Sequence, residues 1–320
     1  MSTHRSPRRP RRPRPLTALL ASALATATLA GGLGSATASA AGGPPAVIRA
    51  VGAENEYANV IAQIGGRYVH TSAIMSNPNT DPHTFEASPS VAKTVAAAQL
   101  VVQNGIGYDD FMNKIEKASP SSGRKVIDVQ TLRGLPDSTP NPHLWYSPQT
   151  MPLVAEALAN DLALLQPAHA AYFQANATRF IDSLKPWYQA LAHFAAAHPN
   201  TPVAVTEPVA DYLLEAAGTH DLTPYSLQAA IMNGTDPAPQ DISQQTSFLS
   251  GHKVKVFLYN EQVTDPLTET WLKAAHRAGI PVVGVYETMP TPGYDYQTWM
   301  QAELRALTRA VSGRTSTAKL

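Results

Sequence analysis

The stretch Ser90-Val-Ala-Lys-Thr-Val-Ala-Ala-Ala-Gln-Leu-Val-Val-Gln103 decides the fold. Residues 90–98 favour a helix, and the apolar run 100–103 that follows has the length and composition of a buried strand. The same alternation extends outward, with strand patterns at 46–51, 68–75 and 125–129 and helical patterns at 55–64 and 108–118. This βαβα order predicts a mostly parallel sheet with helices on both faces.

A second series of strands and helices follows Pro199. Its apolar runs predict strands at 203–206, 254–259 and 282–286. Its segments with helical spacing predict helices at 209–217, 240–249, 266–278 and 296–311. The chain therefore contains two α/β units, with no internal repeat evident in the sequence.

Between the two series, residues 168–197 show an unusually long helical pattern without glycine, which Pro186 should kink. We expect an α/β fold of two lobes, each a mostly parallel sheet flanked by helices, joined by one long linking α-helix. A pair of ordinary core helices split at Pro186 is the alternative. The expected division is an N-terminal lobe at 41–166, the linking helix at 167–199, a C-terminal lobe at 200–311 and a polar, frayed tail at 312–320.

The first forty residues have the features of a secretory signal peptide. Six arginines lie within the first fourteen residues, an Ala- and Leu-rich stretch follows, and Ala38-Ser39-Ala40 supplies the small residues that signal peptidase reads. We expect cleavage after residue 40 and an extracytoplasmic protein, secreted or associated with the cell surface. A retained membrane anchor is the alternative, and Sec and twin-arginine export both remain open.

Charge and cysteine content exclude several functions. Without the arginine-rich head, 18 basic residues stand against 24 acidic residues, a net charge of −6. This balance disfavours nucleic acid as a partner, because phosphate binding needs a basic face. The chain has no cysteine, so we expect neither disulfides nor thiolate metal ligands, and no lipid anchor on a cysteine.

Two proline-histidine segments indicate a metal site. Asp-Pro-His83 and Asn-Pro-His143 are each followed by an aromatic residue within two positions, and two acids, Glu207 and Glu287, close apolar strand-like runs. Two imidazoles and two carboxylates suit a borderline divalent transition metal, because nitrogen and oxygen donors complete its shell. The candidate ligands are therefore His83, His143, Glu207 and Glu287. Glu261, at another strand end, is the alternative fourth ligand.

Several segments together resemble the extracytoplasmic metal-binding proteins of ABC-type zinc and manganese importers (the cluster A-I family). The resemblance covers most of residues 47–311. It is carried by the segments Glu54-Asn-Glu-Tyr57, Gln63-Ile-Gly-Gly66, Ser76-Asn-Pro-Asn-Thr-Asp-Pro-His-Thr-Phe-Glu-Ala-Ser-Pro-Ser90, Gln103-Asn-Gly-Ile-Gly-Tyr108, Asn141-Pro-His-Leu-Trp-Tyr-Ser-Pro148 and Gly279-Ile-Pro-Val-Val283.

The resemblance implies a metal ion held between two lobes. His83 and His143 would come from the first lobe, and Glu207 and Glu287 from the second. It also implies a function, the high-affinity capture of zinc or manganese outside the cytoplasmic membrane and delivery to an ABC importer permease. We accordingly expect a monomer that binds one divalent ion as cargo and is not an enzyme.

Three features depart from the family pattern. Residues 131–140 are short and contain no histidine, whereas zinc-specialised relatives often have a long His-rich loop there. Glu287 stands where many relatives have aspartate, and the cysteine that anchors lipoprotein relatives is absent. The donor set does not separate zinc from manganese, because hard carboxylates lean toward manganese while zinc binds most nitrogen and oxygen sites more tightly.

Two other classes of function stay open on the sequence alone, a secreted metalloenzyme and a surface adhesin with a structural metal. A hydrolytic site would keep one coordination position open for water, whereas all four proposed ligands here are protein groups. The chain also contains no His-Glu-x-x-His helix, no Gly-x-Ser-x-Gly elbow and no glycine-rich phosphate loop.

Overall fold

A computed structural model describes residues 47–79, 81–290 and 292–320. All of them belong to one compact unit. The expected signal peptide at 1–40 lies outside the described residues. Within the described part, no helix combines the length and apolarity needed to cross a membrane.

The described strands form two four-stranded sheets in which every pairing is parallel. The strand orders are β2-β1-β3-β4 and β6-β5-β7-β8, so the two sheets share one topology. This confirms the predicted α/β fold with two mostly parallel sheets. The strands are β1 (Ile48–Glu54), β2 (Val69–Met75), β3 (Leu100–Gln103), β4 (Lys125–Asp128), β5 (Pro202–Val205), β6 (His220–Asp221), β7 (Val256–Asn260) and β8 (Val282–Val285).

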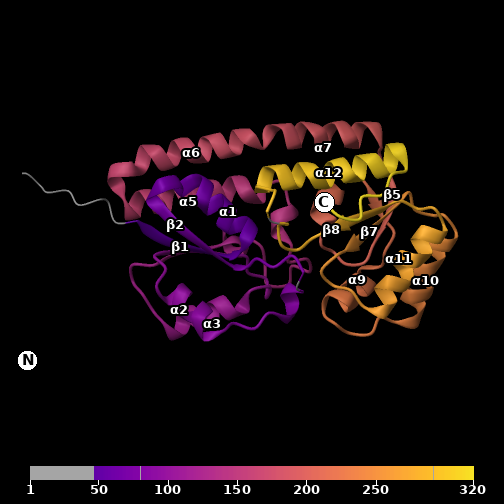
Figure 1. Cartoon of the computed structure of the whole chain (residues 1–320), viewed down its shortest axis with the longest axis horizontal. Helices are drawn as coiled ribbons and strands as arrows, with labels where there is room; N and C mark the ends of the chain where they lie inside the picture. Colours follow the sequence, from indigo (N-terminus) through magenta and orange to yellow (C-terminus); the bar gives the residue numbers. More distant parts are fainter. Residues whose placement is uncertain (1–46, 80, 291) are drawn as a thin grey trace, which may run out of the picture. The chain divides into compact units, whose positions relative to one another are not determined.

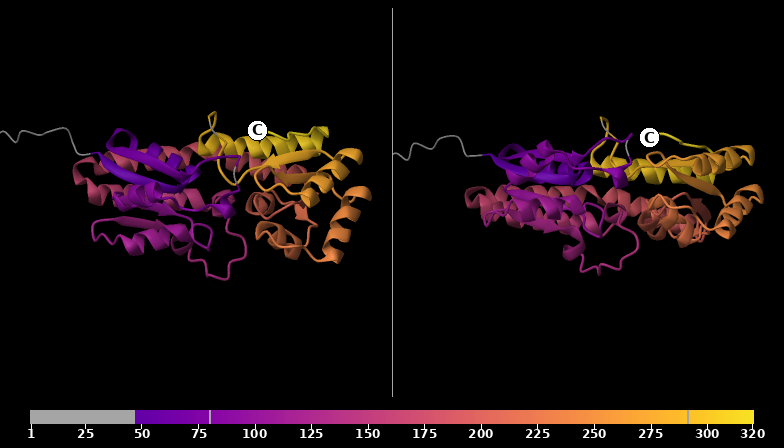
Figure 2. Two further views of the ribbon diagram at one scale, coloured as in Figure 1. Left: turned by 60° about the horizontal axis from the view of Figure 1, so that its bottom comes forward. Right: turned by 90° about the horizontal axis from the view of Figure 1, so that it is seen from below.

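Helices cover both faces of each sheet. In the first lobe, α1, α5 and α6 lie over one face and α2 and α3 over the other, and Figure 1 shows both layers. In the turned views of Figure 2, the two sheets again lie at opposite ends of the described structure. The helices are α1 (Asn55–Gly65), α2 (Pro89–Ala96), α3 (Asp110–Ala118), α4 (Val129–Leu132), α5 (Thr150–Leu165), α6 (Ala170–Ser183), α7 (Lys185–Ala197), α8 (Asp211–Ala216), α9 (Tyr225–Met232), α10 (Pro239–Ser250), α11 (Pro266–Arg277) and α12 (Tyr296–Gly313).

One apolar core runs through both lobes. Alternate residues of a strand point to opposite faces, so Val256 and Leu258 of β7 join this shared core, while Phe257 and Tyr259 join a separate core under α9, α10 and α11. The shared core also contains residues of β1, α1, α5, α6, α7 and α12. Burial against a common core ties the two lobes together.

Hydrogen bonds reinforce this connection. The Asn55 side chain bonds Met289 twice, donating to its carbonyl at 2.8 Å and accepting from its amide at 2.9 Å. The Tyr146 hydroxyl donates to the Tyr286 carbonyl at 2.8 Å, and the Tyr296 hydroxyl donates to the Trp145 carbonyl at 2.7 Å. All of these groups are buried, so a wide separation of the lobes would leave buried polar groups unpaired.

The predicted linking helix corresponds to two helices, α6 and α7, which follow each other end to end in Figure 1. The break falls at Leu184, and Pro186 lies in the first turn of α7, where a missing amide hydrogen removes no helical bond. The division of the chain into lobes and linker stays a prediction.

The prediction of a frayed tail from residue 312 is wrong. Helix α12 continues to Gly313, and the residues after it lie along the edge of β8. The Thr317 amide donates to the Val282 carbonyl at 2.8 Å, and the Gly284 amide donates to the Thr317 carbonyl at 2.9 Å. The polar sequence misled the prediction because these bonds are made by the backbone.

Candidate metal centre

The candidate ligands lie beyond the carboxyl ends of the strands. His83 follows β2 in a short 3-10 helix (Pro82–Thr84), and His143 immediately precedes another (Leu144–Tyr146). Glu207 comes two residues after β5, and Glu287 two residues after β8. Ligands of open parallel sheets bind at this edge, because the connecting loops diverge there and leave a crevice.

Three of the four candidates converge. His83 Nε2 lies 3.0 Å from Glu287 Oε2, and His143 Nε2 lies 3.2 Å from the same oxygen. One donor atom from each of His83, His143 and Glu287 lies within 4.8 Å of the others. The first lobe thus supplies two imidazoles and the second lobe a carboxylate.

Glu207 lies outside this group of three but is connected to it through Asn260, the last residue of β7. The Asn260 Nδ2 atom donates to Glu287 Oε1 at 2.7 Å and to Glu207 Oε1 at 3.1 Å. The second Glu207 oxygen, Oε2, is buried and has no hydrogen-bond partner. A buried carboxylate oxygen without a donor is the kind of atom that a cation satisfies.

Neighbouring polar groups fix both histidines. The Asn141 Oδ1 atom accepts from the His143 amide at 2.9 Å and lies 2.8 Å from His143 Nδ1. This contact favours a proton on Nδ1, which would leave the Nε2 lone pair for an ion, an arrangement typical of metal-binding histidines. Asp81 Oδ1 accepts from the His83 amide at 2.8 Å, which holds the turn that carries His83.

Aromatic side chains enclose the histidines. The Tyr108 hydroxyl donates to Glu287 Oε2 at 3.0 Å, and its ring lies edge-on to His83, with centroids 5.2 Å apart. Trp145 packs edge-on against His143 with centroids 5.4 Å apart. These rings exclude water from the donor atoms and so strengthen electrostatic interactions at the site.

The acids of the site have opposite pKa shifts. Burial, the largest influence, raises the pKa of Glu207 well above its usual value, and the negative charge of Glu287 raises it further. Burial also acts to raise the pKa of Glu287. There, however, the contacts with His143 and His83 and the positive charge of those rings outweigh it and hold the pKa below its usual value. Without an ion, the site keeps Glu287 charged and favours a proton on Glu207.

The histidines also differ. Burial lowers the pKa of both rings, and at His143 this influence prevails. At His83 the close contact with Glu287 at 3.0 Å and its negative charge, with a smaller contribution from Asp81, outweigh burial and raise the pKa. A proton on His83 therefore balances the Glu287 charge when no ion is bound.

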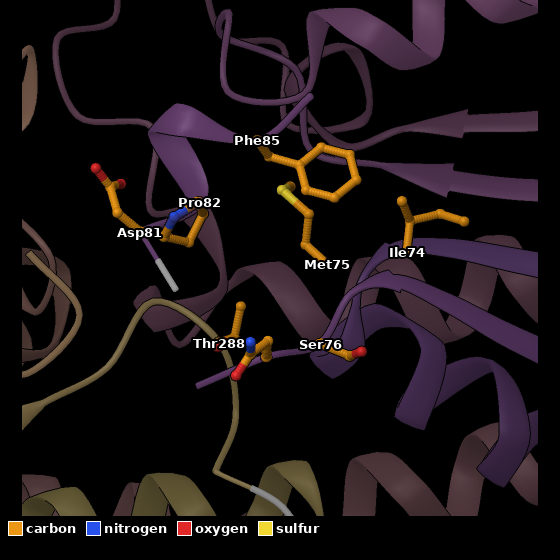
Figure 3. A pocket seen from close by; sticks show the side chains of 8 residues that line it. Ile74, Met75, Ser76, Asp81, Pro82, Phe85 and Thr288 are labelled. Atoms are coloured by element: carbon orange, nitrogen blue, oxygen red, sulfur yellow. The ribbon is translucent and has the colours of Figure 1, made fainter. Parts of the chain in front are cut away.

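The site is most open on the His83 side. The side chain of His83 is 20% exposed, whereas those of His143 and Glu287 are fully buried. A pocket of about 220 Å³ lies beside the His83 turn. Figure 3 shows Met75 and Phe85 next to each other in its lining and Thr288, from the loop after β8, on another wall. Among the three converging residues, His83 is therefore the one that solvent reaches.

The donor spacing fits a first-row divalent ion. Two ligands at about 2.0–2.1 Å from a tetrahedral ion are separated by about 3.3 Å. The separations of 3.0 Å and 3.2 Å from Glu287 Oε2 to the two imidazole nitrogens are close to that value. An ion would replace the proton on His83 with only small movements of the side chains.

The alternative fourth ligand, Glu261, lies elsewhere. It is half-buried, its Cγ lies close to Gly284, and the positive charge of Lys319 acts on its carboxylate. Asn260 and Glu261 are adjacent residues at the end of a strand, so their side chains leave on opposite sides, and Asn260 is the one that faces Glu287.

Three residues that contact the candidate ligands, Tyr108, Asn141 and Asn260, were not singled out from the sequence. Asn141 precedes the Pro-His143 pair, so an Asx turn at that position was a detectable signal. Asn260 ends an apolar run, as Glu207 nearly does, and a polar residue at a strand end is a weaker signal of the same kind. Tyr108 had no signal beyond its place in a glycine-containing loop.

Two curated relatives resemble the chain in sequence. The chain is 24% identical over 137 residues to the manganese-binding lipoprotein MntA of Bacillus subtilis, covering 41% of this chain and 44% of that protein. It is 22% identical over 277 residues to the zinc-binding protein AdcA of Streptococcus pyogenes, covering 76% of this chain and 52% of that protein. The matches thus span about half the length of these curated relatives.

A solved structure shares the fold. The periplasmic zinc-binding protein TroA of Treponema pallidum superposes with a TM-score of 0.70 at 17% identity, over 83% of this chain and 99% of that chain. The sequence model of the family described as "Zinc-uptake complex component A periplasmic" (ZnuA) matches residues 51–310, most of the described chain. The chain therefore belongs to the ZnuA family of zinc-uptake complex components.

Proposed function

We propose that this protein captures a divalent transition metal ion, zinc or manganese, outside the cytoplasmic membrane and passes it to the permease of an ABC importer. We further propose that His83, His143, Glu207 and Glu287 are the ligands. The carrying observation is that Glu287 Oε2 lies 3.0 Å and 3.2 Å from two imidazole nitrogens of the other lobe. Membership of a zinc-uptake family supports the transport role.

The site is suited to capture because its donors come from both lobes. An ion held by two histidines of the first lobe and two acids of the second would stabilise one relative position of the lobes, which a membrane partner can recognise. Buried inter-lobe hydrogen bonds such as Asn55 to Met289 limit the movement to small shifts. We therefore propose a binding protein that performs no chemistry on its ion.

Titration calorimetry of the metal-free chain (residues 41–320) tests the proposal. We expect one Zn²⁺ or Mn²⁺ per chain. Replacement of His83, His143, Glu207 or Glu287 by alanine should weaken binding, because each change removes a donor. Glu261→Ala is the matched control, since it removes a nearby acid that faces away from the site, and it should bind as the unchanged chain does.

Thermal unfolding gives a second test. An ion that binds only the folded state stabilises it by about 2.7 kcal/mol at a concentration of 100 times the Kd. The ligand variants should lose most of the metal-induced rise in Tm but keep a cooperative metal-free transition, because each lobe has its own sheet. If Glu261→Ala loses the rise and Glu287→Ala keeps it, the fourth ligand is misassigned. If neither Glu261→Ala nor Glu287→Ala reduces the metal-induced rise in Tm, the proposed site between two lobes is wrong.

Elemental analysis of protein recovered from the export compartment identifies the ion. Equimolar zinc or manganese would agree with the proposed function. Protein that carries neither ion after export, and binds neither in titration, would contradict it.

A further inference from the structure

Asn260 restrains two acids with one side-chain nitrogen. Its Nδ2 atom carries two hydrogens and donates to Glu287 Oε1 at 2.7 Å and to Glu207 Oε1 at 3.1 Å. Asn260 is fully buried, so water does not compete for these bonds. Asn260 therefore occupies one oxygen of each carboxylate.

The orientation of the Asn260 amide is itself fixed. Its Oδ1 atom accepts from the Gln262 amide at 3.0 Å, which places Nδ2 on the side of the two carboxylates. Gln262 in turn accepts from the Glu287 amide through Oε1 at 2.6 Å. Gln262 thus holds the backbone of Glu287 and Asn260 its side chain, from positions two residues apart at the end of β7.

The bonds from Asn260 leave the second oxygen of each acid available, although Glu207 lies outside the group of three converging donors. Glu287 Oε2 is the atom beside both imidazoles, and Glu207 Oε2 is buried without a partner. Each acid can then bind an ion through one oxygen, and two imidazole nitrogens bring the number of protein donors to four. Four nitrogen and oxygen donors form the tetrahedral set that zinc prefers, whereas manganese favours six oxygen-rich ligands.

We propose that Asn260 is a specificity-determining residue that favours zinc over manganese by holding Glu207 and Glu287 to one coordinating oxygen each. The inference rests on the proposed function, because it needs these two acids to be ligands. It goes beyond that function by assigning the preferred ion and the residue responsible for the preference.

The test compares the affinities of Asn260→Ala and the unchanged chain for Zn²⁺ and Mn²⁺. Loss of a residue that orients metal ligands weakens binding by about 10–100-fold, and we expect this loss for zinc. Manganese affinity should be unchanged or higher, because both carboxylates become free to bind through two oxygens. The preference for zinc should therefore fall by about tenfold or more.

Asn141→Ala is the matched control. Asn141 also positions a candidate ligand, through His143 Nδ1 at 2.8 Å, but it does not touch a carboxylate. It should weaken the binding of both ions by similar factors. An unchanged zinc preference in Asn260→Ala, or an equal change of preference in both variants, would overturn the inference.

Cobalt spectroscopy of the unchanged chain tests the same idea without a variant. Four-coordinate Co²⁺ absorbs visible light intensely, and six-coordinate Co²⁺ absorbs it weakly. We expect the intense bands, and weak bands would overturn the assignment of one oxygen per acid while leaving metal capture intact. A chain that binds no Zn²⁺, Mn²⁺ or Co²⁺ would instead overturn the proposed function and this inference with it.

Discussion

At the scale of single residues, two buried acids show that the neighbouring side chains decide whether a buried carboxyl group is charged. Burial acts to raise the pKa of Glu287, but contacts with two imidazoles hold it below the usual value. Glu303 of α12 is equally enclosed, but its neighbours are the Tyr146 hydroxyl at 3.2 Å and Trp299 Nε1 at 3.1 Å. Burial prevails there and raises the pKa of Glu303 to about 8.

Glu303→Gln should therefore stabilise the metal-free protein at alkaline pH. An acid with a raised folded-state pKa contributes most below its unfolded pKa of 4.5, and that contribution is lost as pH rises to about 8. Glutamine keeps an acceptor for Trp299 Nε1 without the charge. Urea unfolding should show a larger free energy of unfolding for the variant at pH 8.5 and little difference at pH 5.

Glu269→Gln provides the control for that experiment. Glu269 pairs with Lys273 at 3.1 Å, and both side chains are more than half exposed, so its removal should change stability by no more than about 0.5 kcal/mol at either pH. A Glu303→Gln variant that is destabilised equally at both pH values would show that the carboxylate is stabilised in a way that its two contacts do not reveal.

The sequence placed the candidate ligands more securely than it placed their neighbours. His83, His143, Glu207 and Glu287 stand beside prolines or after apolar runs, and such positions become loop ends in a parallel sheet. Asn260 and Tyr108 act through contacts with residues 27 and 179 positions away. No local pattern encodes such pairings, because they depend on how the two sheets face each other.

At the scale of elements, the strands with the strongest apolar runs were predicted closely, and β3 was predicted to the residue. The two-residue strand β6 was missed because His220 and Asp221 form no apolar pattern. The tail after α12 was missed for a related reason. Its sequence is polar, and its order comes from backbone pairing with β8.

Gly284 of β8 permits this tail pairing. A Cβ atom built on Gly284 would lie 2.0 Å from the carbonyl oxygen of Ala318, so alanine there forces the tail away. We expect Gly284→Ala to destabilise the full chain. Hydrogen exchange at the backbone amide of residue 284 should also accelerate, because the bond from this amide to the Thr317 carbonyl is lost.

A chain that ends at Gly313 gives the matching comparison. In that chain Gly284→Ala no longer meets the tail, so the substitution should cost less stability than in the full chain. Equal costs in both chains would mean that the clash arises elsewhere, for example with the Glu261 side chain, whose Cγ lies 3.0 Å from the same Cβ position.

At the scale of the whole molecule, the two sheets share one strand order that the sequence did not reveal. Gly52 of β1 pairs with Val102 of β3, and Val205 of β5 pairs with Leu258 of β7. Two residues further on, an acid therefore stands opposite an asparagine in each lobe: Glu54 and Asn104 in the first, Glu207 and Asn260 in the second.

The two equivalent asparagines, Asn104 and Asn260, make different contacts. In the first lobe, the Asn104 side chain accepts from the Tyr57 hydroxyl at 2.8 Å and donates to the Pro142 carbonyl at 2.8 Å, so it supports the segment that carries His143. In the second lobe, Asn260 holds the acids themselves. A fold built twice thus presents imidazoles from one copy and carboxylates from the other.

Metal-free stability and metal binding should respond to pH in opposite directions. Burial raises the pKa of Asp211 and of Glu303 to about 8 and that of Asp109 to about 7. The folded chain therefore binds more protons than the unfolded chain between pH 8.5 and 6.5, and the free energy of unfolding increases as pH falls through this range. Below pH 6.5 the lowered pKa of His143 offsets this trend by one proton at most, so the free energy of unfolding should keep increasing, more gently, until the acids of the unfolded chain take up protons at their usual values of 3.8 to 4.5.

Zinc binding should weaken over the same range. The raised pKa values of His83 and Glu207 mean that the ion must displace protons from both residues, and this displacement becomes harder as pH falls. Calorimetric scans at fixed zinc concentration should show the Tm of the metal-free chain rising from pH 8.5 to 6.5 while the zinc-induced increment shrinks. Two Tm curves that fall in parallel with acidification would contradict both halves of the argument. If the metal-free Tm rises on acidification while the zinc-induced rise in Tm stays constant, His83 and Glu207 are not ligands. The explanation of metal-free stability by the buried acids would still hold.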